Sequence, residues 1–236
     1  MKEKNSINSN PSNLAFYKAH DFAKPFIGHH FSANSLKLLL IGESHYLSSY
    51  EGIPSVENWY SNSENCTTNF LDKHPKNKDW LNPNYIIGTA FFDNHGHTSF
   101  GIFRNPAQCV QKELHLTDFK EAMHHMAFYN YFLRPAEKKG DSIKVSPEDK
   151  KQSFDHFLNV LEILKPKQVI FTSTKAYKAF KETVRKRDQK IDVSIEKTCH
   201  PSSAWWNRET ASYGFSPGEK LTGKARFTRI IKKSIS

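Results

Sequence analysis

The sequence of 236 residues has few cysteines and no long apolar run. Its three cysteines, Cys66, Cys109 and Cys199, are odd in number and far apart in the chain, so they form neither a disulfide framework nor a C-x-x-C metal site. No stretch approaches the ~18 consecutive apolar residues of a membrane-spanning helix, and the first residues contain no apolar core of a signal peptide. We therefore expect free thiols in a reducing compartment, a cytoplasmic location and no contact with a membrane.

The chain length suits one domain, but two segments depart from a regular pattern. Residues 1–12 are polar and rich in Asn and Ser, which predicts a disordered lead before a single domain at 13–236. Residues 47–117 scatter many aromatic side chains among Asn, Ser, Pro and Gly without helical or strand periodicity. We interpret this part as an insertion of loops and short helices that packs against a central sheet.

The net charge of +10 is concentrated in the second half of the chain. Up to Asp118, acidic and basic residues nearly cancel, and the remainder carries the whole excess of Lys and Arg. Clustered basic side chains gain affinity for a polyanion by displacing counterions from its phosphates. A basic surface also keeps a protein soluble, so the charge alone leaves both interpretations open.

The stretch Leu36–Tyr46 combines a buried strand with a cluster of reactive side chains. Leu38 to Ile41 form an unbroken apolar run, which is typical of a strand covered on both faces of a parallel sheet. Gly42 lets the backbone turn at the carboxyl end of that strand. Glu43, Ser44, His45 and Tyr46 would then lie on the loop where open α/β sheets bind ligands.

Further along the chain, strands and helices alternate. Residues 126–133 are β-prone and carry Asn130, whose amide is either satisfied by nearby backbone or directed into a ligand site. Ser146-Pro147-Glu148-Asp149 has the start signals of a helix, and Val169 to Thr172 and residues 191–197 follow as strands. This alternation predicts βαβ units and a parallel sheet, and therefore an α/β fold.

Histidines and acidic residues offer one weak candidate metal site. Asp93, His95 and His97 alternate in D-N-H-G-H, which on a strand would place three ligands on one face. Turn residues interrupt the pattern, so solvated turn residues are the better interpretation. We expect no metal.

Four ordered features together resemble the uracil-DNA glycosylase superfamily. They are a buried strand ending in Gly42 to Tyr46, a second strand with Asn130, a helix–Lys-Pro–strand unit at 146–172, and His200-Pro201-Ser202 after the last strand. The resemblance covers most of residues 36–233 apart from the insertion. It implies a three-layer αβα fold with a central, mainly parallel four-stranded sheet.

The resemblance also implies roles for individual residues. Tyr46 matches the tyrosine that stands against C5 of uracil and excludes the methyl group of thymine, and Asn130 matches the asparagine that recognises the edge of the flipped base. His200 matches the histidine that donates to uracil O2 as negative charge develops there. Ser202 would hold a phosphate. Phe91, Phe100 and Phe103 compete for the role of the aromatic ring that stacks on the base.

The sequence departs from that family pattern at several positions. Ser44 stands where the best-known branch has the Asp that serves the hydrolytic water, and His45 stands at a Pro position. Glu43 still provides a carboxylate near the sugar. Three distant cysteines cannot hold the iron–sulfur cluster of another branch, so we expect no cofactor.

The DNA contacts are also altered. Ala204 replaces the leucine that enters the duplex, and Trp205 or Trp206 either substitutes for it by stacking or belongs to the core. We assign Ser44, Ser202, Ser203 and the two tryptophans as candidate contacts to the DNA backbone. DNA, single-stranded or as a damaged duplex, is the expected partner, and we expect a monomer.

Two main functions follow. The first is a DNA glycosylase of base-excision repair that hydrolyses the N-glycosidic bond of uracil or another deaminated base. The second is a weakly active or inactive member of the superfamily that binds a nucleobase, nucleotide or nucleic acid. A metal-dependent hydrolase that uses the histidine pairs ranks last. The environment of Glu43 discriminates between the first two: a carboxylate beside His200 favours hydrolysis, and one paired with a structural Arg or Lys favours binding.

Overall fold

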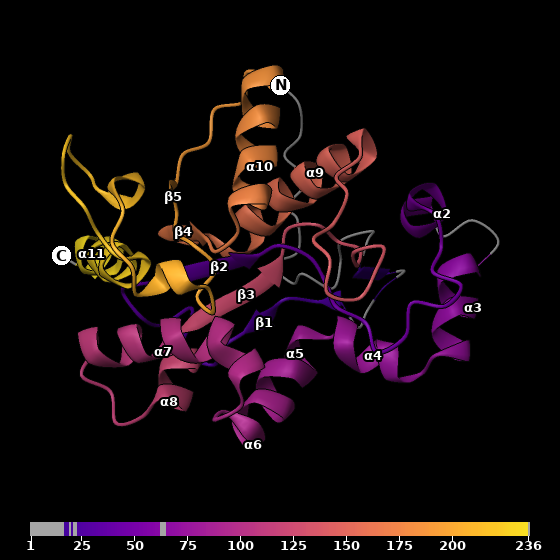
Figure 1. Ribbon diagram of the computed structural model, residues 1–236, viewed down its shortest axis with the longest axis horizontal. Coiled ribbons are helices and arrows are strands. Elements are labelled where there is room, and N and C mark those ends of the chain that lie inside the picture. The colour runs from indigo at the N-terminus through magenta and orange to yellow at the C-terminus, as the bar shows by residue number, and fades with distance from the viewer. Residues whose placement is uncertain (1–16, 19, 21–22, 62–64, 236) are drawn as a thin grey trace.

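The computed structural model describes residues 17–18, 20, 23–61 and 65–235, so the predicted lead at residues 1–12 lies outside the described part. A mixed five-stranded sheet forms the centre of the molecule (Figure 1). Its spatial order is β1-β3-β2-β4-β5, and the strands are β1 (Phe26–Ile27), β2 (Leu38–Gly42), β3 (Met126–Asn130), β4 (Gln168–Phe171) and β5 (Ser194–Lys197). Strands and helices alternate along much of the chain, and the fold is α/β.

Strand β2 occupies the middle of the sheet. All of its residues are buried, and it pairs in parallel with β3 on one side and with β4 on the other. Strand β5 continues the parallel part beyond β4, whereas β1 pairs antiparallel with β3 at the opposite edge. The expectation of four strands is therefore wrong by one edge strand. Because β1 has two residues, it is too short to produce a periodic pattern in the sequence.

Helices cover both faces of the sheet (Figure 1). One face carries α9 (Pro147–Leu164) and α10 (Thr174–Arg187), and the other carries α7 (Gly101–Glu113), α8 (Phe119–His124) and α11 (Gly223–Ile235). Leu39 and Ile41 of β2 belong to the first apolar core, whereas Leu38 and Leu40 belong to the second. This division explains why the run is apolar without interruption, since alternate residues of a strand face opposite sides.

The start of α9 agrees with its sequence signals. The Ser146 hydroxyl accepts a hydrogen bond from the backbone N–H of Asp149 at 3.0 Å, and the Asp149 carboxylate accepts from the backbone N–H of Ser146 at 2.8 Å. Asp149 is fully buried and also binds Arg134, whose Nε lies 2.8 Å from Oδ1 and whose Nη2 lies 2.9 Å from Oδ2. This ion pair ties α9 to the segment that follows β3.

The segment at 47–117, interpreted from the sequence as an insertion, consists of short helices and one long one. The short elements are α2 (Val56–Ser61), α3 (Cys66–Lys73), α4 (Lys76–Leu81), α5 (Pro83–Tyr85), the π-helix η4 (Ile86–Phe91), α6 (Phe92–Asn94) and the 3₁₀ turn η5 (Thr98–Phe100). Trp59, Phe70 and Leu81 belong to a small separate core, whereas Ile87 and Phe91 pack into the second core of the sheet. The thirteen-residue helix α7 was not expected.

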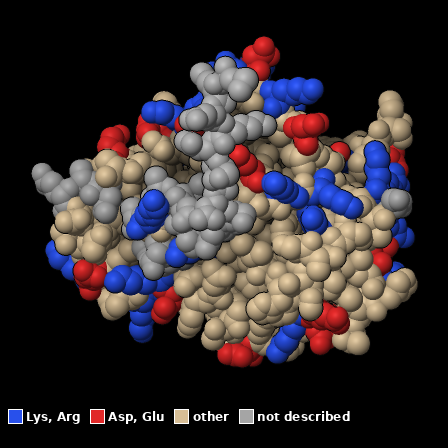
Figure 2. All heavy atoms as spheres, turned by 180° about the vertical axis from the view of Figure 1, so that it is seen from behind, with Lys and Arg blue, Asp and Glu red and all other residues tan. Residues whose placement is uncertain are grey.

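The chain after β5 is mostly irregular. It contains the 3₁₀ turns η6 (Ala204–Trp206) and η7 (Ala211–Tyr213) before α11. On the face seen in Figure 2, basic side chains are interspersed with acidic ones. Three basic residues of α11 form ion pairs, namely Arg226 with Glu196, Arg229 with Glu219 and Lys232 with Glu113. Within the described part of the chain, none of the helices combines the length and the apolar composition that a membrane span requires.

Candidate functional site

A cavity of about 560 Å³ opens at the carboxyl ends of the parallel strands. Its polar side chains come from the loop after β2, the end of β3, the turn η5, the segment between β3 and α9, and the loop after β5. Its apolar side chains come mainly from β3, α7 and the short helices of the insertion. The lining residues are Glu43, Ser44, His45, Tyr46, Trp80, Pro83, Ile86, Ser99, Phe100, Ile102, Phe103, Phe128, Asn130, Gly140, Asp141, Ser142, His200 and Ser202.

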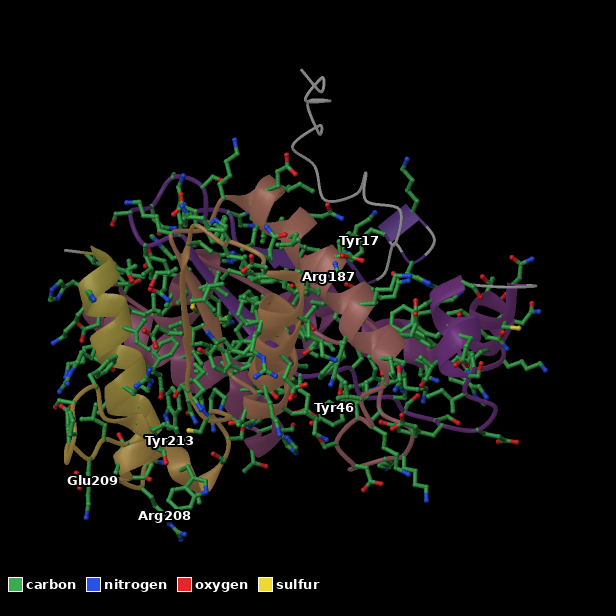
Figure 3. All side chains as sticks on the ribbon, turned by 90° about the horizontal axis from the view of Figure 1, so that it is seen from above. Tyr17, Tyr46, Arg187, Arg208, Glu209 and Tyr213 are labelled. Carbon is green, nitrogen blue, oxygen red and sulfur yellow. The ribbon has the colours of Figure 1, made fainter. Side chains whose placement is uncertain are left out.

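The cavity brings together residues that lie far apart in the sequence. Glu43, Tyr46, Asn130 and His200 all line it, because the carboxyl ends of parallel strands meet at one edge of the sheet. Figure 3 shows Tyr46 beside the segment between β3 and α9, well separated from Tyr17 and Tyr213. Four other candidates also line the cavity: Ser44, Phe100, Phe103 and Ser202.

Two serine hydroxyls orient the carboxylate of Glu43. Ser173, the N-cap of α10, donates to Oε2 at 2.7 Å, and Ser142 donates to Oε1. Among the described residues, Glu43 forms no ion pair with Lys or Arg. The two hydroxyl donors therefore fix the orientation of the carboxylate at the cavity wall, which is the arrangement that suits stabilisation of a nearby positive charge.

His200 lies half-buried in the same cavity. Burial lowers the pKa of its imidazole, and the negative charge of Glu43 opposes that shift without reversing it. The backbone N–H of Ser202 donates to His200 Nδ1 at 3.2 Å, so Nδ1 acts as an acceptor. A neutral imidazole with Nδ1 as acceptor carries its proton on Nε2. His200 is thus prepared to donate one hydrogen bond.

Asn130 and His45 form a contact that the sequence did not reveal. His45 is 3% exposed, and burial lowers its pKa to about 4. Its Nδ1 lies 3.4 Å from the amide nitrogen Nδ2 of Asn130. On the neighbouring strand, Gly42 is the register partner of Asn130, and a Cβ at Gly42 would clash with Oδ1 of the amide. Glycine at this position therefore makes room for the Asn130 side chain.

Aromatic side chains form much of the remaining wall. Phe103 packs edge-to-face on Phe128, with ring centroids 5.0 Å apart. Tyr46 and Trp80 also line the cavity, and with 52% and 45% of their surface exposed both side chains remain accessible to solvent. Burial, Glu43 and Tyr50 together raise the pKa of Tyr46, which keeps its hydroxyl neutral. Trp80 was missed because the insertion has no periodicity from which its position could be deduced.

Several predicted site residues lie outside the cavity. Phe91 is fully buried between Phe103 and Phe119 in the second core, so the prediction that it could stack on a base is wrong. Trp206 is also buried and packs on Phe227 with centroids 5.7 Å apart, which makes it a core residue. Ser203 and the half-exposed Trp205 do not line the cavity either. Aromatic side chains occur both in apolar cores and in ligand sites. The residue type alone therefore did not show which of these aromatic residues line the cavity.

The histidine clusters do not form a metal site within the described residues. No group of three or more His, Cys, Asp or Glu side chains is placed there so that it could hold an ion. His97 caps the turn η5 and contacts the Ser99 hydroxyl at 2.5 Å, and His95 packs against Phe119. His29 stacks on His124 at 4.6 Å, near the start of β3 and therefore at the other end of that strand from Asn130.

No protein-family model, no curated protein and no solved structure matches this chain.

Proposed function

We propose that this protein binds a uracil-type base in the cavity and hydrolyses the N-glycosidic bond that joins the base to DNA, as members of the uracil-DNA glycosylase superfamily do. The observation that carries the proposal is the meeting of Glu43, Asn130 and His200 in one cavity. These residues come from the loop after β2, the end of β3 and the loop after β5, and each has the chemistry that one part of the reaction needs.

The departing base takes the negative charge of the broken bond, and His200 is suited to stabilise it. A neutral imidazole whose Nδ1 accepts from Ser202 can donate its Nε2 proton to O2 of the base. A preformed donor aimed at a developing oxyanion typically contributes ~10²–10³ in rate. The lowered pKa of His200 keeps the ring neutral at physiological pH, so it would act as a hydrogen-bond donor rather than as a cation.

The sugar develops the opposite charge, and Glu43 supplies the anion that would stabilise it. Two carboxylates usually share the work in glycoside hydrolysis. Here the base itself leaves as an anion assisted by His200, so one carboxylate held by Ser142 and Ser173 is sufficient for the electrostatic part. Glu43 can also orient a water molecule for attack on the sugar.

The base would be recognised by Asn130 and Tyr46. The amide of Asn130 can donate to a carbonyl oxygen and accept from the neighbouring ring N–H, which is the pattern along one edge of uracil. The phenol ring of Tyr46 would block a 5-methyl group. Phe100 or Phe103, which line the cavity, would contact the face of the base.

One observation favours binding without efficient hydrolysis. Ser44 lines the cavity at the position where the resemblance places a carboxylate for the hydrolytic water. A serine hydroxyl can hold water but is a poor base at neutral pH. The alternative function is therefore retention of a nucleobase, nucleotide or nucleic-acid end in the same cavity.

An excision assay separates these functions. Purified protein is incubated with oligonucleotides that contain uracil, hypoxanthine or xanthine, alkali reveals abasic sites, and binding is measured on the same oligonucleotides. We expect strand breaks at uracil, reduced about 10²-fold or more in Glu43→Gln and His200→Leu. Glu57→Gln, on the exposed face of α2, is the matched control and should retain activity. Binding without strand breaks would select the alternative, and the absence of both would contradict the proposal.

A further inference from the structure

His45 lies against the amide that is expected to recognise the ligand. The ring is buried within the cavity wall, and its Nδ1 is 3.4 Å from Asn130 Nδ2. The backbone holds both residues in place. Beyond β3, the N–H groups of Tyr131 and Phe132 donate to the carbonyl oxygens of Gly42 and Glu43, and His45 itself forms an isolated parallel bridge with Pro135. The loop after β2 and the chain after β3 therefore run side by side through this contact.

A side-chain amide has two orientations that differ by a half-turn about its last bond, and its hydrogen-bond partner selects between them. With nitrogen towards His45, the amide donates to an unprotonated Nδ1. With oxygen towards His45, it would need a proton on Nδ1. The structure has the nitrogen towards the ring and the oxygen over Gly42, where no Cβ obstructs it.

The two hydrogens of the amide nitrogen then have separate uses. The hydrogen trans to the carbonyl oxygen is the one that the amide can donate to His45 while it also binds a ligand. The hydrogen cis to the oxygen, together with Oδ1, then provides a donor and acceptor pair for the ligand. Such a pair fits an edge that carries a carbonyl oxygen beside a ring N–H, as in uracil. It mismatches cytosine, which presents an amino group beside an unprotonated nitrogen.

We infer that His45 is a positioning residue that holds the Asn130 amide in the orientation selective for a carbonyl and N–H edge, and so sets the preference of the cavity for uracil over cytosine. The ligand in this inference rests on the proposed function, whereas the contact between the two side chains does not. His45 touches no ligand atom in this account and acts through Asn130 alone. The hydrogen-bond acceptor Nδ1 of His45 orients the Asn130 amide, and an apolar ring of the same volume would not.

The variants that test this inference separate the acceptor from the volume. His45→Phe keeps a ring and removes the acceptor, whereas His45→Gln keeps an oxygen that can accept from the amide. The measurement is the ratio of affinities for single-stranded oligonucleotides with uracil or cytosine at one position. We expect His45→Phe to reduce this ratio about tenfold or more, because neither orientation of the amide then has a hydrogen-bond partner on the ring and the preference between the two orientations is lost. His45→Gln should restore part of the ratio.

The matched control is His156→Phe. His156 is another buried histidine, but it lies in the first core, where its Nε2 contacts the Tyr17 hydroxyl at 2.7 Å. Its replacement should lower stability and leave the ratio of affinities unchanged. If His45→Phe and His156→Phe both lower the ratio of uracil affinity to cytosine affinity, base selectivity follows general stability and the inference is overturned.

A spectroscopic measurement tests the contact without any ligand. Nitrogen NMR of the wild-type protein should show that His45 is protonated on Nε2 and unprotonated on Nδ1. It should also show a coupling across the hydrogen bond between His45 Nδ1 and Asn130 Nδ2. A proton on Nδ1 would overturn the inference, as would an unchanged uracil preference in His45→Phe. A wild-type protein that binds and cleaves no base would contradict the proposed function instead, while the NMR result would still decide the orientation of the amide.

Discussion

Replacing Asp149 by alanine should destabilise the protein more than any surface change on the same helix. Asp149 is fully buried and binds Arg134 through both carboxylate oxygens, and Arg134 is itself 4% exposed. The carboxylate also accepts from the Tyr60 hydroxyl at 2.8 Å and completes the cap of α9. Removing one partner of a buried ion pair typically costs about 3–5 kcal/mol. The contact of Arg134 with Glu137 at 2.9 Å survives, so we expect the lower half of that range.

The assay is urea unfolding monitored by tryptophan fluorescence. The matched control is Asp155→Ala on the same helix, because Asp155 pairs with Arg187 while their side chains are 46% and 36% exposed. Exposed pairs contribute about 0–1 kcal/mol, so this variant should unfold near the wild-type midpoint. The reasoning fails if Asp149→Ala loses less than about 1 kcal/mol, or if both variants lose the same amount.

Four further outcomes are expected. Asn130→Asp should weaken uracil binding and raise the relative affinity for cytosine, and Asn130→Ala should weaken binding without that change; equal base preference in both variants would remove the asparagine from base recognition. Tyr46→Ala should admit thymine, measured by excision or binding with a thymine oligonucleotide, and continued rejection would assign the block elsewhere. Binding to DNA should weaken steeply between low and physiological salt if the basic helices α10 and α11 contact phosphates, and a flat titration would indicate an uncharged contact. The free energy of unfolding should fall as the pH drops from about 6.5 towards 4. Burial lowers the folded-state pKa of His45 to about 4 and that of His156 to about 3, so the unfolded state binds more protons than the folded state in that range. His45 alone should account for a loss of about 3 kcal/mol. Urea midpoints independent of pH over this range would contradict the buried, neutral state of both rings.

The sequence was most informative where a short local rule determined the structure. The apolar run before Gly42 formed the central strand, and Ser146 capped the helix that Pro147 begins. Glu43, Asn130 and His200 meet in one cavity because parallel strands place their carboxyl ends at one edge of the sheet. These features needed no knowledge of distant contacts.

The rest depended on contacts that no local pattern records. Helix α7 begins with a glycine and contains Pro106, so its start has no capping signal and its interior contains a helix breaker. Phe91 and Trp80 are both aromatic residues of the segment 47–117, which has no periodic pattern, yet one is fully buried and the other is 45% exposed at the cavity. His45 was expected on the ligand-binding loop and noted as a departure from a family pattern, but the sequence assigned it no role. Its contact with Asn130 depends on two chain segments 85 residues apart.

The close approach of Gly42 and Asn130 has a consequence for how this sequence can change over time. Any side chain at position 42 would occupy the space of the Asn130 carbonyl oxygen and force the amide to move. Substitution at either position is therefore constrained by the other, and an exchange of Gly42 would have to be accompanied by a smaller or differently directed residue at position 130. Chains that descend from a common ancestor with this one should vary at the two positions together. A relative with glycine and asparagine at these two paired positions should have the same close contact between β2 and β3 at the cavity wall.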